Sequence, residues 1–215
     1  DVFPRGSAPM PMSTARRKRI FNFMGPTVAG CMVGTQGIFP PTITLASAMA
    51  RPSGVCFLGI IPYNTIMVTA NILYASTSGH TEYVTQLLEE QLHNEKSLTV
   101  RRIRAEVARP EDLIGSDILI LASGTWNTGG IEGQLNPHMY DFLLGRAKDM
   151  DLHGKKVAII ALGDDRYFYT CRAGEHLRQF VQTHGGCVLE PPLLIVNEPY
   201  GQEEQVRKWG SALLV

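Results

Sequence analysis

The sequence predicts an α/β fold in which five parallel strands form a doubly wound sheet with helices on both faces. From Met67 onward, short apolar runs alternate with stretches whose apolar residues recur at helical spacing. The runs at 117–122 and 157–162 are apolar without alternation, as expected of central strands that helices cover on both faces. No internal repeat or linker interrupts this stretch, so residues 67–215 are expected to form one domain.

Each strand is predicted from an apolar run bounded by polar or turn-forming residues. The five runs lie at residues 70–75, 98–103, 117–122, 157–162 and 188–196. The last run contains Pro191 and Pro192, which lack the backbone N–H that a strand ladder needs. The fifth strand is therefore expected to be interrupted.

Helices are predicted between these strands because apolar residues recur there three and four positions apart. The residues that define the four helices are Val84, Leu87, Leu88 and Leu92; Met139, Phe142, Leu143 and Ala147; Leu177, Phe180 and Val181; and Val206, Trp209 and Leu213. All of them are expected to pack in the core and to contact no ligand.

Residues 1–66 differ from the rest in being rich in Pro, Gly, Ser, Thr and Met and almost free of acids. We expect an N-terminal extension that is disordered or not translated, with translation starting at Met67 and a cytoplasmic protein as the result. Two alternatives stay open. The basic residues 16–19 and an apolar stretch before Cys31 could form the signal of an exported lipoprotein anchored at Cys31, and the Arg-rich composition could mark a transit peptide. The sequence contains no run of about 18 apolar residues, so no membrane-spanning helix is predicted.

Composition excludes several classes of protein. Hydrophobic residues make up 44% of the chain and charged residues 19%, which is enough apolar content for a packed core. Residues 1–66 hold six basic side chains and one acidic, so the remaining residues hold fourteen basic and nineteen acidic. A mildly acidic domain without a basic stripe is a poor candidate for nucleic-acid binding. The four cysteines are scattered and show no metal-ligand spacing, so a reduced chain without a metal is expected.

A loop rich in hydroxyl groups follows the first predicted strand. It reads Ser76, Thr77, Ser78, Gly79, His80, Thr81. Hydroxyls, backbone N–H groups and the amino end of the next helix can together surround a phosphate. The loop has no lysine and no G-x-G-x-x-G pattern, which excludes a Walker loop and a dinucleotide turn. The alternative is that Ser and Thr only cap the helix, and His80 is expected to face solvent.

Residues 72–83, which read ILYASTSGHTEY, resemble the phosphate-loop signature of the flavodoxin family, with Thr85 at a packing position where the family usually has Ala. The resemblance covers residues 67–215 and is closest to short-chain flavodoxins. It implies the flavodoxin-like strand order 2-1-3-4-5, with FMN at the switch point between strands 1 and 3. That placement is a known property of the family.

Two later loops match the flavin-flanking loops of the same family in order and spacing. The resemblance implies that FMN contacts residues of the loop at 124–132 and of the loop at 163–171 with its preceding strand end. These residues are Gly124, Thr125, Trp126, Asn127, Thr128 and Gly129, and Leu162, Gly163, Asp164, Tyr167, Phe168 and Cys171. Trp126 is expected to stack on one face of the flavin and Tyr167 on the other, since flat aromatics favour such packing, whereas Tyr169 is expected to pack within the protein.

The resemblance implies a monomeric, low-potential one-electron carrier between a reductase and an acceptor enzyme, and not an enzyme itself. Glu132, Asp164 and Asp165 could steer basic partners, whereas a cation at Arg166 would oppose a low potential. Asn127 stands where many relatives have a Gly whose peptide rearranges when the flavin is reduced. The two one-electron potentials of the flavin are therefore expected to lie closer together than in those relatives. Three alternatives remain: an FMN-dependent NAD(P)H:quinone-type oxidoreductase, a flavin domain detached from a larger reductase, and an interaction module without flavin.

Overall fold

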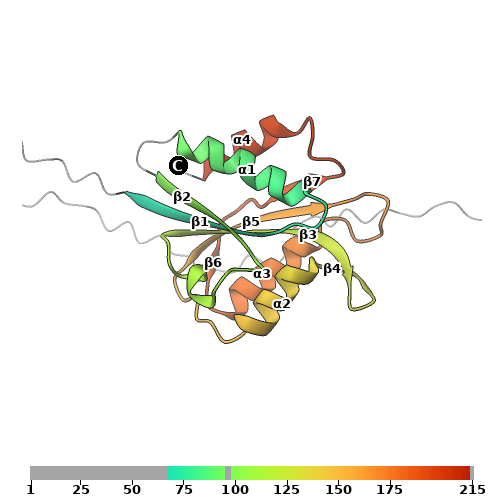
Figure 1. Cartoon of the computed structure of the whole chain (residues 1–215), viewed down its shortest axis with the longest axis horizontal. Coiled ribbons are helices and arrows are strands. Elements are labelled where there is room, and N and C mark those ends of the chain that lie inside the picture. The colour runs from blue at the N-terminus through green and yellow to red at the C-terminus, as the bar shows by residue number, and fades with distance from the viewer. Residues whose placement is uncertain (1–66, 95–97, 214–215) are drawn as a thin grey trace, which may run out of the picture.

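One parallel sheet runs between two layers of helices in the computed structural model, which describes residues 67–94 and 98–213 (Figure 1). The strands are β1 (Val68–Ala75), β2 (Leu98–Arg104), β3 (Ile118–Thr128), β4 (Ile131–Leu135), β5 (Lys156–Gly163), β6 (Cys187–Val188) and β7 (Leu193–Val196). The helices are α1 (His80–His93), α2 (Pro137–Asp141), α3 (Ala173–Thr183) and α4 (Glu203–Ala212), with a 3-10 turn η1 (Pro110–Leu113) and a π-helical turn η2 (Phe142–Arg146). The extension expected at residues 1–66, with Cys31, lies outside the described residues.

The strand order β2-β1-β3-β5-β6 confirms the predicted order 2-1-3-4-5. The fifth predicted strand is split, because β6 pairs with the start of β5 and β7 with its end. Pro191 and Pro192 lie between the two pieces, and neither can donate to the β5 ladder. Ala75 pairs with Ser123, and Gly124 with Leu162, so the carboxyl ends of β1, β3 and β5 lie side by side.

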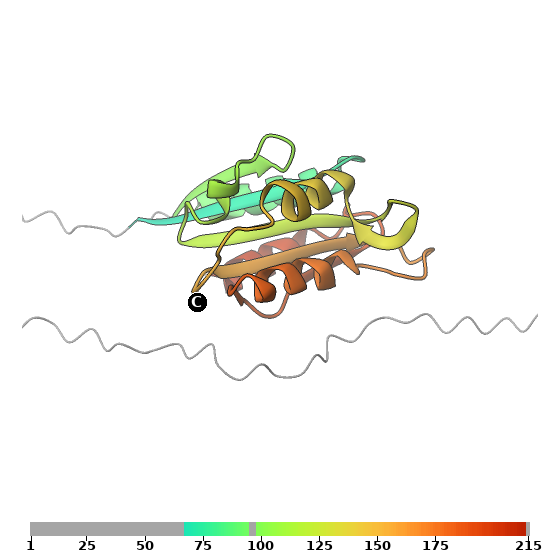
Figure 2. The same ribbon diagram turned by 90° about the horizontal axis from the view of Figure 1, so that it is seen from below.

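Strand β3 continues six residues beyond the predicted end at residue 122 and folds back into the antiparallel strand β4. Residues expected to form an open loop are therefore paired in a hairpin. Gly129 and Gly130 both have positive φ at its turn, a conformation that suits glycine. Figure 2 shows this hairpin curling beyond the end of the sheet. The strand structure fixes the direction of each side chain on it.

The four predicted helices are present, and their apolar residues fill the two layers beside the sheet. Helices α1 and α4 cover one face, and α2 and α3 cover the other (Figures 1 and 2). Val84 and Leu88 belong to the core cluster on the first face, and Phe142 and Leu177 to the cluster on the second. No helix within the described ranges is long and apolar enough to cross a membrane. The described helices thus lie on the two faces of the sheet, and the loops that follow the strands lie at its carboxyl edge (Figure 1).

Candidate functional site

A pocket of about 560 Å³ opens at the carboxyl ends of β1, β3 and β5. Four segments line it: the loop after β1, the β3–β4 hairpin, the loop after β5 and the loop after β7. The lining residues are Thr77, Ser78, His80, Thr81, Gly124, Thr125, Trp126, Asn127, Glu132, Gly133, Leu162, Gly163, Asp164, Arg166, Tyr167, Tyr169, Asn197 and Glu198. Most residues expected to bind the cofactor are therefore brought together around a single pocket.

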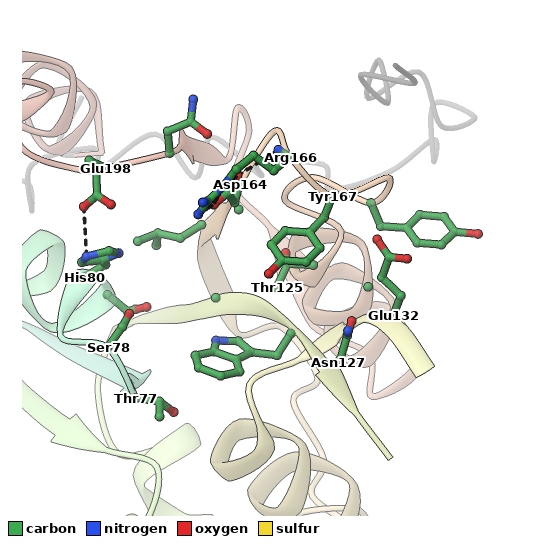
Figure 3. Close-up of a pocket in the computed structure, with 18 residues that line it drawn as sticks. Thr77, Ser78, His80, Thr125, Asn127, Glu132, Asp164, Arg166, Tyr167 and Glu198 are labelled. Atoms are coloured by element: carbon green, nitrogen blue, oxygen red, sulfur yellow. Dashed lines mark hydrogen bonds and ion pairs between the residues drawn. The ribbon is translucent and has the colours of Figure 1, made fainter. Parts of the chain in front are cut away.

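The loop after β1 presents hydrogen-bond donors to this pocket. Thr77 and Ser78 are exposed at its wall (Figure 3). The N-cap of α1 is Gly79, with φ 89° and no side-chain cap hydrogen bond. The structure therefore differs from the alternative interpretation, in which a Ser or Thr side chain caps this helix: the N-cap is a glycine. Among the described residues, no side chain accepts a hydrogen bond from the first backbone N–H groups of α1, and such groups attract anions.

Ser76 lies beneath the loop and does not line the pocket. It is 6% exposed, and its Oγ has no hydrogen-bond partner among the described residues. Buried hydroxyls normally find a partner, so an unpaired one beside an uncapped helix fits a phosphate-binding loop. The unpaired hydroxyl and the uncapped helix therefore support phosphate binding by this loop independently of the sequence pattern.

His80 lies at the pocket wall and does not simply face solvent as expected. Its Nε2 is 3.0 Å from Glu198 Oε2, and its side chain is 33% exposed. Its ring also meets Tyr200 edge to face, with centroids 6.0 Å apart. The loop after β7 was not predicted to belong to the site, although Figure 3 shows Glu198 facing His80. His80 therefore joins the phosphate loop to the carboxyl end of the last strand.

Trp126 lines the pocket, and its ring lies against Gly124. A Cβ built at Gly124 would lie 3.0 Å from Trp126 Nε1, so any side chain there would push the indole away. Asn127 follows at a break in the β3–β4 register. Among described non-glycine residues, positive φ occurs at Cys171 and Asn197 and not at Asn127. The hairpin thus holds the indole against the strand without backbone strain at Asn127.

The loop after β5 carries Tyr167 and the pair Asp164 and Arg166. Tyr167 is 55% exposed and borders the pocket from the loop opposite the hairpin (Figure 3). Arg166 Nε lies 3.0 and 2.9 Å from the two carboxylate oxygens of Asp164. These contacts lower the pKa of Asp164, and they raise that of Arg166. The guanidinium charge is therefore neutralised locally by a carboxylate that also lines the pocket.

The two aromatic-bearing segments are joined to each other. Glu132 Oε1 accepts a 2.9 Å hydrogen bond from the backbone N–H of Phe168. A Cβ at Gly133 would lie 2.7 Å from Tyr169 Cβ, so this glycine permits close contact between hairpin and loop. Arg172 lies 4.2 Å from the centre of the Tyr169 ring. Glu132 therefore has a structural partner, and Tyr169 packs as expected while also lining the pocket.

Several expected contact residues lie outside the pocket for identifiable reasons. Thr128 bonds to the carbonyl of Leu135 within the hairpin, and Gly129 forms its turn. Phe168 is 44% exposed and packs edge to face on Tyr169. Cys171 is 5% exposed beneath the loop, and burial raises the pKa of its thiol to about 12.

Four residues near the site were missed by the sequence analysis: Gly133, Asn136, Asn197 and Glu198. Asn197 and Glu198 follow the last strand, and the carboxyl ends of parallel strands converge, so topology could have indicated them. Asn136 precedes Pro137, a pair typical of a helix start. No cluster of three or more His, Cys, Asp or Glu side chains suited to a metal occurs within residues 67–94 and 98–213.

Comparison with known proteins gives concordant matches. The family model described as Flavodoxin matches residues 72–209. A flavodoxin from Maridesulfovibrio salexigens is 29% identical over 143 residues, which cover 66% of this chain and 94% of that protein. The structure of oxidised Flavodoxin 2 from Bacillus cereus superposes with a TM-score of 0.61 at 28% identity, over 68% of this chain and 97% of the other. A short-chain flavodoxin associated with a bacterial microcompartment shares the fold, with a TM-score of 0.57 at 22% identity over 69% and 97% of the two chains.

Proposed function

The chain belongs to the flavodoxin family, whose members are FMN-binding electron carriers and not enzymes, and on that premise we propose that the pocket at the carboxyl ends of β1, β3 and β5 is its FMN site. Family membership confirms the predicted cofactor and carrier function, and it argues against the oxidoreductase alternative. The individual contact residues at this site are part of the proposal.

The phosphate of FMN is proposed to bind the loop at 76–81. Support comes from the uncapped start of α1 and from the hydroxyls of Thr77 and Ser78 at the pocket wall. Ser76 does not line the pocket, but its buried Oγ has no partner in the described chain and adds a further hydroxyl to this loop. A phosphate accepts hydrogen bonds from such groups and interacts favourably with a helix amino end. No positive side chain is required for this binding mode.

The flat ring is proposed to lie between Trp126 and Tyr167. The observation that carries the proposal is that both aromatics and the hydroxyl loop line one pocket. Two stacked aromatics contribute about 0.5–1.5 kcal/mol each beyond their buried area and keep water from both faces. Bound FMN would supply the electron-accepting and electron-donating chemistry. The protein would bind and orient it and exclude water.

The redox partners are proposed to be a donor reductase and an acceptor enzyme that contact the rim of this pocket. Tyr167 and Phe168 are exposed on the loop after β5, and the lining of the same pocket holds the carboxylates of Glu132, Asp164 and Glu198 together with the guanidinium of Arg166, so acidic charge is in excess. Exposed aromatics beside acids suit a partner with a basic, partly apolar surface. We further propose that the carrier works as a monomer. We also propose a low potential, since Arg166, the guanidinium among the described pocket-lining residues, is paired with Asp164.

Titration of the flavin-free chain with FMN, followed by fluorescence, tests the proposed ring position. In the wild-type chain, Trp and flavin emission should both fall on binding. Trp126→Ala and Tyr167→Ala should each weaken binding about tenfold, as expected for loss of about 1.4 kcal/mol. Tyr140→Ala is the matched control, because Tyr140 is exposed on α2 outside the pocket. Equal affinity in all three variants would refute the proposed sandwich.

A further inference from the structure

Asn136 is a fully buried polar residue where the β3–β4 hairpin passes into α2. Its relative exposure is 0%. Its backbone N–H lies 3.1 Å from both the Gly124 carbonyl and Ser123 Oγ. These bonds attach Asn136 to β3, the strand that carries the pocket-lining residue Trp126. The position of its side chain is therefore fixed by the hairpin.

The orientation of the Asn136 amide follows from its two partners. Oδ1 accepts a 3.1 Å hydrogen bond from the backbone N–H of His138 and so caps α2. A backbone N–H can only donate, so the oxygen of the amide must face it. The amide nitrogen then points the other way, where Nδ2 lies 2.8 Å from Thr77 Oγ1. Asn136 is thus the donor and Thr77 the acceptor in this bond.

This bond settles what the Thr77 hydroxyl can do. A hydroxyl has one hydrogen to donate and two lone pairs. Because Asn136 occupies a lone pair, the hydrogen of Thr77 stays available, and no other hydrogen bond of this side chain occurs in the described part of the chain. Thr77 is exposed at the pocket wall. An anion can only accept hydrogen bonds. In a loop without lysine, the hydroxyl groups must therefore be oriented so that they donate to it.

We propose that Asn136 is a positioning residue that makes Thr77 a hydrogen-bond donor toward the FMN phosphate and couples the phosphate loop to the hairpin bearing Trp126. This inference rests on the proposed binding of phosphate at residues 76–81. It assigns a role to a buried side chain that does not line the pocket. A change of the Asn136 side chain should therefore alter the recognition of phosphate without altering the fold.

Asn136→Asp reverses the polarity of the bond while keeping its shape. Asp is as good an N-cap as Asn, so α2 should still be capped. A carboxylate oxygen facing Thr77 would accept the hydroxyl hydrogen and leave a lone pair facing the phosphate. The measured quantity is the phosphate preference, defined as the Kd for riboflavin divided by the Kd for FMN. It should fall about tenfold or more, because the hydrogen bond that is lost joins a hydroxyl to a charged phosphate, while the riboflavin Kd should stay the same.

A double-mutant cycle with Thr77→Val separates hydroxyl polarity from plain charge repulsion. If Asn136 acts through Thr77, Asn136→Asp should reduce the phosphate preference much less in the Thr77→Val background than in the wild type. Equal reductions in both backgrounds would overturn the inference, since the effect would then come from charge alone. Asn94→Asp, at the far end of α1, is the matched control for the same chemical change.

Asn136→Ser covers the case in which the carboxylate prevents folding. Ser also caps helices but is too short to reach Thr77, so the phosphate preference should fall several-fold, and an unchanged value would overturn the inference. Failure of the proposed function looks different. If the wild-type chain binds FMN no better than riboflavin, the phosphate loop itself is wrong, and the role of Asn136 falls with it. If wild type prefers FMN and every Asn136 variant keeps that preference, only the inference fails.

Discussion

The phenol of Tyr83 donates a 2.7 Å hydrogen bond to Glu203 Oε1 and so joins the first turn of α1 to the first turn of α4. The same carboxylate oxygen accepts a 3.0 Å bond from the backbone N–H of Gly201. The bond from Gly201, followed by that from Tyr83, lowers the pKa of Glu203 from 4.5 to about 2. Glu203 therefore holds the loop after β7, which carries Glu198, against the helix that begins at the phosphate loop.

The lowered pKa of Glu203 predicts a loss of stability in acid. A carboxyl whose pKa is lower in the folded state contributes stability that is present above its unfolded value and is lost as the pH falls. The window for Glu203 runs from about pH 4.5 down to about 2. Glu203→Gln should therefore flatten the fall in the free energy of unfolding across that window. Glu204→Gln, at an exposed position in the same turn, is the control, and equal curves for the two variants would contradict the assignment.

Gly163→Ala should destabilise the protein and weaken FMN binding. A Cβ at Gly163 would lie 2.2 Å from the backbone nitrogen of Cys171, a contact that requires the loop after β5 to move. Overpacking of this kind costs roughly 1–3 kcal/mol. Gly145→Ala is the matched control, because its Cβ would meet nothing closer than 3.6 Å. Denaturant unfolding of both variants checks the prediction, which fails if they are equally stable.

Arg166→Gln should lower the potential at which the bound flavin accepts negative charge, because the Asp164 carboxylate then lacks its partner. Asp164→Asn should shift the potential in the opposite direction, because the guanidinium is then uncompensated. Both residues are partly or largely exposed, so each shift should stay below about 59 mV, the value of a tenfold change in a one-electron equilibrium. Potentiometric titration at two salt concentrations measures it. Shifts of the same sign in both variants would rule out this pairing as the cause.

Asn127→Gly should move the two one-electron potentials of the flavin further apart. Asn127 lies at the register break of the hairpin without positive φ, and glycine reaches positive φ at less cost than asparagine. A peptide free to adopt both conformations can adjust to the reduced flavin. Asn127→Ala is the control, since it removes the same side chain without adding that freedom. Identical potentials in the Gly and Ala variants would exclude backbone freedom as the cause.

Much of the fold was predictable because central strands and amphipathic helices leave strong periodic signals. The hairpin was not, since its two strands flank Gly129 and Gly130 within a segment that reads as a loop. The role of Glu132 depends on a bond to Phe168 from a different strand end. Neither the pairing of β3 with β4 nor the bond between Glu132 and Phe168 leaves a local sequence pattern.

The site was partly predictable for a related reason. Thr77 and Trp126 sit in contiguous motifs, whereas the residues that hold them are distant in sequence. Asn136 reaches Thr77 across 59 positions, and Glu198 reaches His80 from the last strand end. Such pairings arise from the strand order and cannot be derived from one loop at a time. Motifs therefore indicate the ligand contacts, and tertiary structure determines how they are supported.

The most direct test of the account is to titrate the full purified chain with FMN and to count the flavin bound per chain while the visible spectrum is recorded during stepwise reduction. We predict one FMN per chain, with binding that is tighter than that of riboflavin and electrons that are taken up one at a time. A chain that leaves added FMN free in solution would contradict the central claim, whatever its fold.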